Sequence, residues 1–374
     1  MKNIRLVFTF ILFCGLCAIH AYGNPVRVVA PAYPILVQAN DQKTASELVF
    51  FCDTFISYMR NKWNITPVKL PTLTITASNQ PDHNAETTFL TSDRSISINP
   101  TSDDSLRLLS LFLCNHILRS ICDKQSGYKA EPIIPRVIPE GIVGAFLKIK
   151  INPNFTTIHH MLADGHAIPL EVMMNVERTL SPTMEQLFIL QSTYFMEYLV
   201  NTNNGSKLLR QFLLQTQTNK QLALLYVARA HSKKNTSELA VDFYEKTILR
   251  RPVYNVVSPY KHFSDKSLSL LLDEILVFRY SYTLDDGRER SVTIKAGDMK
   301  VGDTYYITQK QIEEQIFQLR ILKSCTDKKN HDKIKSYITA LEYLKESDYN
   351  KYLDYYHIAK YMNDISQKDT PSTP

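Results

Sequence analysis

The chain has 374 residues, of which 44% are hydrophobic and 21% are charged, and these values are typical of globular proteins with a packed core. The net charge of +6 comes from lysine and arginine residues interleaved with aspartate and glutamate, so the composition gives no support for nucleic acid as a partner. The length allows two or three domains.

The N-terminus has the pattern of a secretory signal peptide. Met1–Arg5 is short and basic, and an almost unbroken apolar run follows from Leu6 to Ile19. Ala21 and Gly23 then offer positions for cleavage. Residues 1–23 are therefore predicted to be a signal peptide, and the protein is predicted to be periplasmic or extracellular.

The same apolar run bears on membrane attachment. It is shorter than the ~20 residues that span a bilayer, and no second run of this kind follows, so we expect no stable membrane span. A lipid anchor on Cys17 is disfavoured because Leu16 stands where a lipoprotein signal has a small residue.

The first part of the mature chain predicts a helix, a small sheet and another helix. Apolar residues recur at helical spacing from Thr44 to Trp63. The alternation in Leu73–Thr76 and the β-branched residues of Thr87–Ile98 predict two or three short strands. Thr101–Asp104 has a capping signature before an apolar helix that runs to about Cys122.

The rest of the chain is mostly helical in pattern. Pro139 and Glu140 suit the first turn of another helix. A hairpin is expected where two β-rich runs flank Asp285–Gly287. Its strands are predicted at 278–282 and 291–295, and helices at 183–200, 206–214, 220–230, 266–276 and within 309–365.

Strands and helices do not alternate as they do in a parallel α/β sheet, so the predicted fold class is α+β and predominantly helical. A change in composition near Arg251 suggests a boundary. The predicted organisation is a first domain at 24–250, a mostly helical C-terminal region with a hairpin at 251–365, and a disordered tail at 366–374.

Four cysteines remain after the signal peptide, namely Cys52, Cys114, Cys122 and Cys325. They are too few for a disulfide scaffold in a chain of this length. Cys114 and Cys122 are eight residues apart on one predicted helix and too distant to bond each other. Any bridge must therefore include Cys52 or Cys325.

Two helical segments carry a family resemblance. The first reads LSLFLCNHILR from Leu109 to Arg119, and the second reads IPRVIPEGIVGAFL from Ile134 to Leu147. With a helix and small sheet before them and helices after them, they resemble the gluzincins, zinc metallopeptidases with a peptidase MA-like domain. In that family an apolar helix carries His-Glu-x-x-His and a second helix begins with a Glu-Gly pair. The resemblance covers roughly Val28 to Leu249 and implies a metallopeptidase-like fold with a small N-terminal sheet plus helices.

The residues that carry the family's chemistry are missing. Two histidines four apart would bind zinc, and the glutamate between them would activate the metal-bound water. No frame through Cys114–Ser120 supplies two such ligands and a carboxylate. We therefore expect no catalytic, metal-binding or cofactor-binding residues in a degenerate domain. The vestigial positions are Cys114, Asn115, His116, Arg119 and Glu140.

Two of these positions have a structural interpretation of their own. Glu140 alone matches a family position, the third zinc ligand, but its place near the positive end of a helix dipole favours a structural role. His116 on an apolar helix is more typical of a semi-buried core histidine than of a ligand.

Two other clusters have functional and structural interpretations. His160, Asp164 and His166 could bind a divalent ion, but a polar loop is the favoured interpretation of His159–His166 because no fourth ligand is in view. Tyrosines crowd the C-terminal helices and could receive a peptide or glycan, although helix packing explains most of them. They are Tyr337, Tyr343, Tyr349, Tyr352, Tyr355, Tyr356 and Tyr361.

The leading hypothesis is an exported, catalytically inactive metallopeptidase-like protein that acts as a binding or scaffolding module for a protein, peptide or glycan ligand. One alternative is a hydrolase with an unconventional metal site drawn from His116, Glu140 and His159–His166. Another is a structural envelope protein. The first rests on the fold-level resemblance beside the missing zinc ligands.

Overall fold

The computed structural model describes residues 25–30, 32–67, 70–78, 94–100, 102–126, 132–147, 167–201, 205–249, 265–284 and 286–368. The predicted signal peptide, the segment His159–His166 and the predicted tail beyond Lys368 lie outside these residues. The chain divides into two compact units, Met1–Lys129 and Ala130–Pro374. The boundary predicted near Arg251 falls within the second unit, in a part of the chain that is not described.

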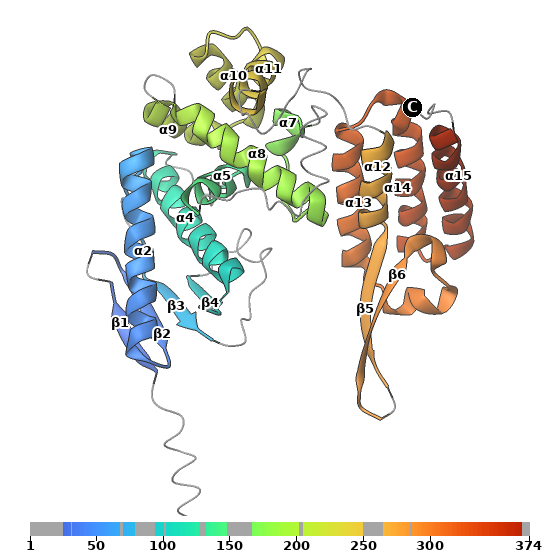
Figure 1. Cartoon of the computed structure of the whole chain (residues 1–374), viewed down its shortest axis with the longest axis horizontal. Coiled ribbons are helices and arrows are strands. Elements are labelled where there is room, and N and C mark those ends of the chain that lie inside the picture. Colours follow the sequence, from blue (N-terminus) through green and yellow to red (C-terminus); the bar gives the residue numbers. More distant parts are fainter. Residues whose placement is uncertain are drawn as a thin grey trace, which may run out of the picture. The chain divides into compact units, whose positions relative to one another are not determined.

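The fold is α+β and mostly helical, as predicted (Figure 1). The sheet of the first unit has the order β1-β2-β3-β4, with β1 antiparallel to β2 and the other neighbours parallel. Its strands are β1 Val26–Val29, β2 Ile35–Ala39, β3 Leu73–Ala77 and β4 Ser95–Ile98. The sequence patterns predicted β3 and the region of β4 but missed β1 and β2.

Two long helices complete the first unit. Helix α2, Gln42–Trp63, begins where Asp41 accepts a hydrogen bond from the amide of Thr44 at 2.8 Å, and it ends at Asn64 in the left-handed conformation. Its apolar side chains join those of one sheet face in the core. Helix α4, Asp103–Ser126, extends four residues beyond the predicted end at Cys122.

The second unit begins with helices that carry the predicted Glu-Gly segment. Their bounds are α5 Val137–Phe146, α7 Leu170–Met173, α8 Pro182–Val200, α9 Gly205–Thr216, α10 Lys220–Ala230 and α11 Thr236–Tyr244, followed by the π-helix η1 Glu245–Leu249. The predicted helices at 183–200, 206–214 and 220–230 correspond to α8, α9 and α10. Helices α7 and α11 were not predicted.

The rest of the second unit combines a hairpin with helices, as predicted (Figure 1). The elements are α12 Asp265–Ile275, β5 Val277–Thr283, β6 Glu289–Lys295, the 3₁₀ turns η2 Ala296–Asp298, η3 Val301–Tyr306 and η4 Lys328–Asn330, and the helices α13 Gln309–Ser324, α14 His331–Lys345 and α15 Tyr349–Lys368. Gly287 turns the hairpin with a φ of 81°, which glycine adopts without strain. Helix α15 includes the first three residues of the predicted tail.

Membrane-spanning helices were not expected. Within the described ranges, none of the helices is both long enough and apolar enough to cross a bilayer.

Candidate functional site

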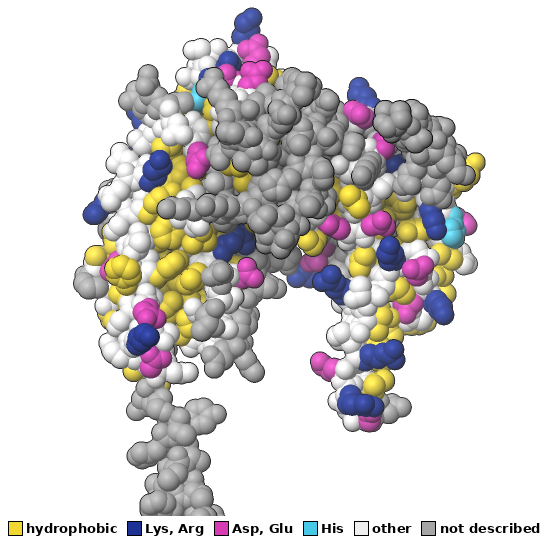
Figure 2. Space-filling model, viewed as in Figure 1, with side chains coloured by type: hydrophobic (Ala, Val, Ile, Leu, Met, Phe, Trp, Pro, Cys, Tyr) yellow, Lys and Arg dark blue, Asp and Glu magenta, His cyan; other side chains and the backbone are white. Residues whose placement is uncertain are grey.

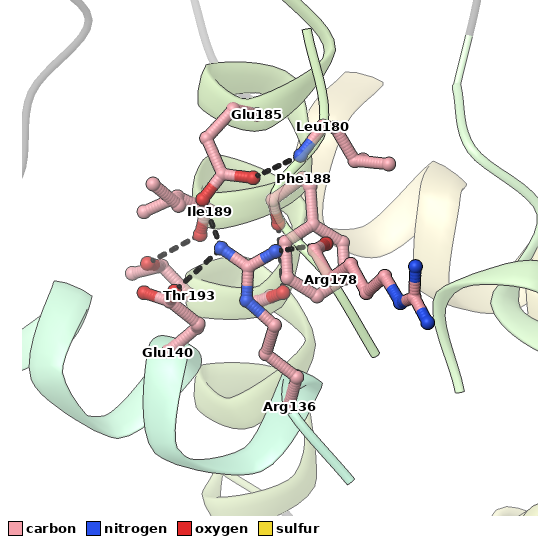
Figure 3. A network of polar contacts seen from close by, with 9 residues as sticks. Arg136, Glu140, Arg178, Leu180, Glu185, Phe188, Ile189 and Thr193 are labelled. Atoms are coloured by element: carbon pink, nitrogen blue, oxygen red, sulfur yellow. Dashed lines mark hydrogen bonds and ion pairs between the residues drawn. The ribbon is translucent and has the colours of Figure 1, made fainter. Parts of the chain in front are cut away.

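Glu140 is engaged by a buried arginine one helical turn earlier. Its carboxylate, at the position that the resemblance aligns with a zinc ligand, has no solvent exposure. Arg136, whose side chain is 2% exposed, donates from Nη2 to Oε1 of Glu140 at 3.0 Å. The two residues therefore form a buried, charge-assisted hydrogen bond within the first turn of α5 (Figure 3).

The guanidinium of Arg136 also ties α5 to the chain around the start of α8. Its Nη1 donates to the carbonyl oxygen of Arg178 at 2.6 Å, and its Nη2 donates to the carboxylate of Glu185. Glu185 in turn accepts from the amide of Leu180 at 3.0 Å, and the ring of Phe188 lies 5.0 Å from the guanidinium carbon (Figure 3). One cation thus joins two helices and the loop before α8.

The charge of Arg136 is maintained inside the protein. Burial opposes the charged guanidinium, but the carboxylates of Glu140 and Glu185 outweigh burial and raise the pKa of Arg136 above its ordinary value. Sequence reasoning missed both carboxylate partners of Arg136. Glu140 was within reach of prediction as an i, i+4 pair, whereas Glu185 is 49 residues away from Arg136.

Helix α5 lies unusually close to α8 next to this network. A Cβ atom on Gly141 would lie 2.3 Å from the backbone oxygen of Ser192, and one on Gly144 would lie 2.0 Å from Oγ1 of Thr193. The helix that carries Glu140 therefore packs against the backbone of α8 at Gly141 and against a side chain of α8 at Gly144.

The other vestigial positions belong to α4 of the first unit. Cys114, Asn115 and His116 are buried, and the ring of His116 packs edge-on against Phe112 with ring centroids 4.7 Å apart. This agrees with the interpretation of His116 as a core histidine. Arg119 lies on the same helix, while Glu140 belongs to the second unit.

The described ranges contain no cluster of side chains suited to binding a metal ion. Across these residues, His, Cys, Asp and Glu side chains form no group of three or more that could hold a metal ion. The His159–His166 segment lies outside them.

The four cysteines are buried and unbridged. Burial, assisted by the charge of Asp53, raises the pKa of the Cys52 thiol to about 12, and burial also raises the pKa of Cys325. Thiols with a raised pKa contain little of the reactive thiolate, so Cys52 and Cys325 are inert in this structure.

Comparisons with known proteins add no relative. No protein-family model matches the chain, and no curated protein matches it. The resemblance to gluzincins stays a prediction from the order and pattern of the sequence.

Most of the C-terminal tyrosines pack inside their unit, as the structural interpretation expected. Tyr352 is fully buried and Tyr337 is 4% exposed. The hydroxyl of Tyr352 donates to the carbonyl oxygen of Ala296 at 2.5 Å, and that of Tyr349 donates to the carbonyl oxygen of Met299. Tyr361 is the most exposed of the predicted set, at 68%.

A different group of tyrosines gathers beside the hairpin, and two of its four members are exposed. The rings of Tyr280 and Tyr306 stack with centroids 5.2 Å apart, and Tyr282 lies 5.3 Å from Tyr306. Tyr306 is 47% exposed and the adjacent Tyr305 is 83% exposed. We call these four residues the tyrosine surface. Sequence reasoning missed it, although strand alternation places Tyr280 and Tyr282 on one face.

Asp303 fixes one ring of the tyrosine surface. The hydroxyl of Tyr280 donates to Oδ1 of Asp303 at 2.7 Å, and this hydrogen bond, assisted by burial, raises the pKa of Tyr280 to about 12. Aromatic residues, tyrosine among them, are enriched in the cores of interfaces where proteins bind partners. The surface is therefore suited to binding.

A second polar cluster surrounds Asp242, just before the π-helix η1. The carboxylate accepts from the hydroxyl of Tyr198 at 2.5 Å and pairs with Lys233 at 2.7 Å and Lys246 at 2.9 Å. Burial opposes ionisation of Asp242, but these hydrogen bonds outweigh it and lower its pKa to about 2. The ring of His231 stacks on Tyr198 with centroids 4.2 Å apart.

This cluster predicts a pH dependence of stability. Burial, with smaller contributions from Lys246 and Lys233, lowers the pKa of His231 below 6.5 despite the charge of Asp242. The neutral ring is thus favoured in the fold, and its contribution is complete above the unfolded pKa and lost as the pH falls through the folded pKa. The thermal unfolding midpoint is expected to fall between about pH 7.5 and 5.

The variant His231→Phe isolates this contribution. Phenylalanine keeps an aromatic ring against Tyr198 but does not titrate, so the fall in midpoint should be smaller than in the wild type. Equal pH slopes in the two proteins would contradict the assignment to His231.

Proposed function

We propose that the protein is an exported, catalytically inactive metallopeptidase-like protein that acts as a binding or scaffolding module. Its ligand would be a protein, a peptide or a glycan. The proposal joins the sequence resemblance to the surroundings of Glu140.

The observation that carries the proposal is the pairing of Glu140 with Arg136. A glutamate that holds a catalytic zinc must present a carboxylate oxygen to a metal site that substrate and water can reach. Glu140 instead has no exposure and bonds to a buried guanidinium. A fixed positive charge at 3.0 Å also disfavours a second cation at the same carboxylate. These features support a structural role for Glu140.

The tyrosine surface supports the binding part of the proposal. Tyr305 and Tyr306 expose flat, amphipathic rings that lose little conformational freedom on binding. The stack of Tyr306 on Tyr280 and Tyr282 holds one of these rings in place before a ligand arrives. Such preorganised rings suit the face of a sugar or a peptide side chain.

Elemental analysis of protein purified without chelators tests the catalytic part. We expect zinc and other transition metals to be far below one per chain, and we expect a chelator to leave the thermal unfolding midpoint unchanged. Glu140→Gln should not change the metal content. Glu177→Gln, which removes an exposed carboxylate from the same unit, is the matched control.

Near-stoichiometric metal that is lost in Glu140→Gln but kept in Glu177→Gln would overturn the proposal in favour of the hydrolase alternative. The chelator measurement on the wild type decides the same question if Glu140→Gln does not fold.

A further inference from the structure

In the β5–β6 hairpin, the backbone groups of even-numbered residues point toward the other strand, and those of odd-numbered residues point away from it. Register pairs Phe278 with Ile294 and Tyr280 with Val292. The amide of Ala296 donates to the carbonyl of Leu276 at 2.9 Å, which extends the same ladder. Even-numbered residues of the two strands therefore bond each other. On β6 the amides and carbonyls of the odd-numbered residues point away from β5.

The outer edge of β5 is covered by other side chains, whereas the outer edge of β6 is open. Side chains of α13 cover the edge of β5, since Gln311 donates to the carbonyl of Arg279 and Gln315 donates to the carbonyl of Val277. Within the described ranges no hydrogen bond engages the outward backbone groups of Glu289, Ser291 and Thr293 on β6. An open strand edge of this kind is a template for pairing with another strand.

The open edge is accessible within its unit. The hairpin projects away from α12–α15 (Figure 1), and both acidic and basic side chains lie along the projection (Figure 2). The side chains of the outward residues Glu289, Ser291, Thr293 and Lys295 are all exposed.

We propose that the outer edge of β6 pairs with the same edge of a second copy of this chain, antiparallel and with the two-fold axis at Val292. In this register Ser291 of each copy lies opposite Thr293 of the other, and these odd-numbered residues present the free amides and carbonyls that the ladder needs. The two hairpins become one four-stranded sheet, an isologous interface.

Charge complementarity favours a second copy of the chain as the partner of this edge, and it favours one register of pairing. An axis at Val292 places Glu289 of each copy opposite Lys295 of the other, so two opposite-charge pairs form on one face of the new sheet. An axis at Ser291 would place Glu289 opposite Thr293, and an axis at Thr293 would place Lys295 opposite Ser291. Only the register at Val292, among these three that use the outward groups, gives the charge pairs.

Sedimentation velocity on the full chain over about a hundredfold range of concentration tests the proposal. A reversible dimer is expected. Lys295→Glu replaces both opposite-charge pairs by like-charge pairs and should raise the dimer dissociation constant about tenfold. Thr293→Pro removes an outward amide at an edge position that tolerates proline, and should abolish the dimer.

A charge swap distinguishes a contact between copies from a local effect. Glu289→Lys combined with Lys295→Glu restores the opposite charges and should return the dissociation constant to within about threefold of the wild type. Both variants keep the same new carboxylate beside Asp273, 3.6 Å from Lys295 in the wild type. Lys360→Glu on α15 changes the net charge equally and should leave the dimer intact.

Three results would overturn the proposal. They are a monomer at every concentration, a dimer that Thr293→Pro leaves intact, and a dimer that Lys295→Glu weakens but the charge swap does not restore. Circular dichroism on each variant shows whether the fold is kept.

Discussion

Arg136→Met is expected to lower the free energy of unfolding by about 3–5 kcal/mol, because it leaves the fully buried Glu140 without its cation. Glu185 loses the same partner, and the carbonyl of Arg178 loses its donor. Methionine has a similar length and fills the space, so the loss reports the uncompensated charge more than a cavity. Urea unfolding at neutral pH measures the change.

Two further variants show whether the charge is the cause. Arg136→Met with Glu140→Leu removes both partners of the buried pair and should recover a large part of the loss. Arg320→Met breaks an exposed pair with Glu342 and should cost less than about 1 kcal/mol. A loss from Arg136→Met no larger than that of Arg320→Met would show that the network contributes little to stability.

The elements that the sequence predicted are those whose signal is local. The 3.6-residue apolar spacing is sufficient for α2, and the alternation around Asp286–Gly287 is sufficient for the hairpin. Strands β1 and β2 were missed because their patterns are short and their stability comes from pairing with each other and with β3.

The candidate site was less predictable because part of its network, Arg178 and Glu185, is distant in sequence from Arg136. The dipole argument placed Glu140 correctly in the first turn of α5 but did not show that it would bond Arg136, or that Arg136 would also bond Glu185. The crowding of tyrosines on the C-terminal helices allowed for a binding face there, but most of those rings pack against other side chains of their unit. The exposed rings of the tyrosine surface, Tyr305 and Tyr306, lie on η3 instead, and composition alone does not show which tyrosines a fold leaves exposed.

Close packing between α5 and α8 fixes the position of Glu140, and Gly141→Ala tests it. Alanine is favoured over glycine in a helix by about 1 kcal/mol, but the new Cβ would lie 2.3 Å from a backbone oxygen, so we expect a net loss of about 1–3 kcal/mol in urea unfolding. The Cγ atom of Met196 would lie equally close, at 2.3 Å, but the backbone of Ser192 stays in place when Met196 is replaced, so that replacement should restore only part of the stability.

Gly144→Ala gives the complementary result. Its new Cβ meets the side chain of Thr193, so Thr193→Ala, which removes Oγ1, should rescue part of the loss. Gly302→Ala, where no atom lies within 4 Å, should change stability by no more than about 0.5 kcal/mol. Unchanged stability in Gly141→Ala would mean that α5 can move away from α8. The helix would then have room to present Glu140 differently, and the structural role assigned to that carboxylate would lose its support.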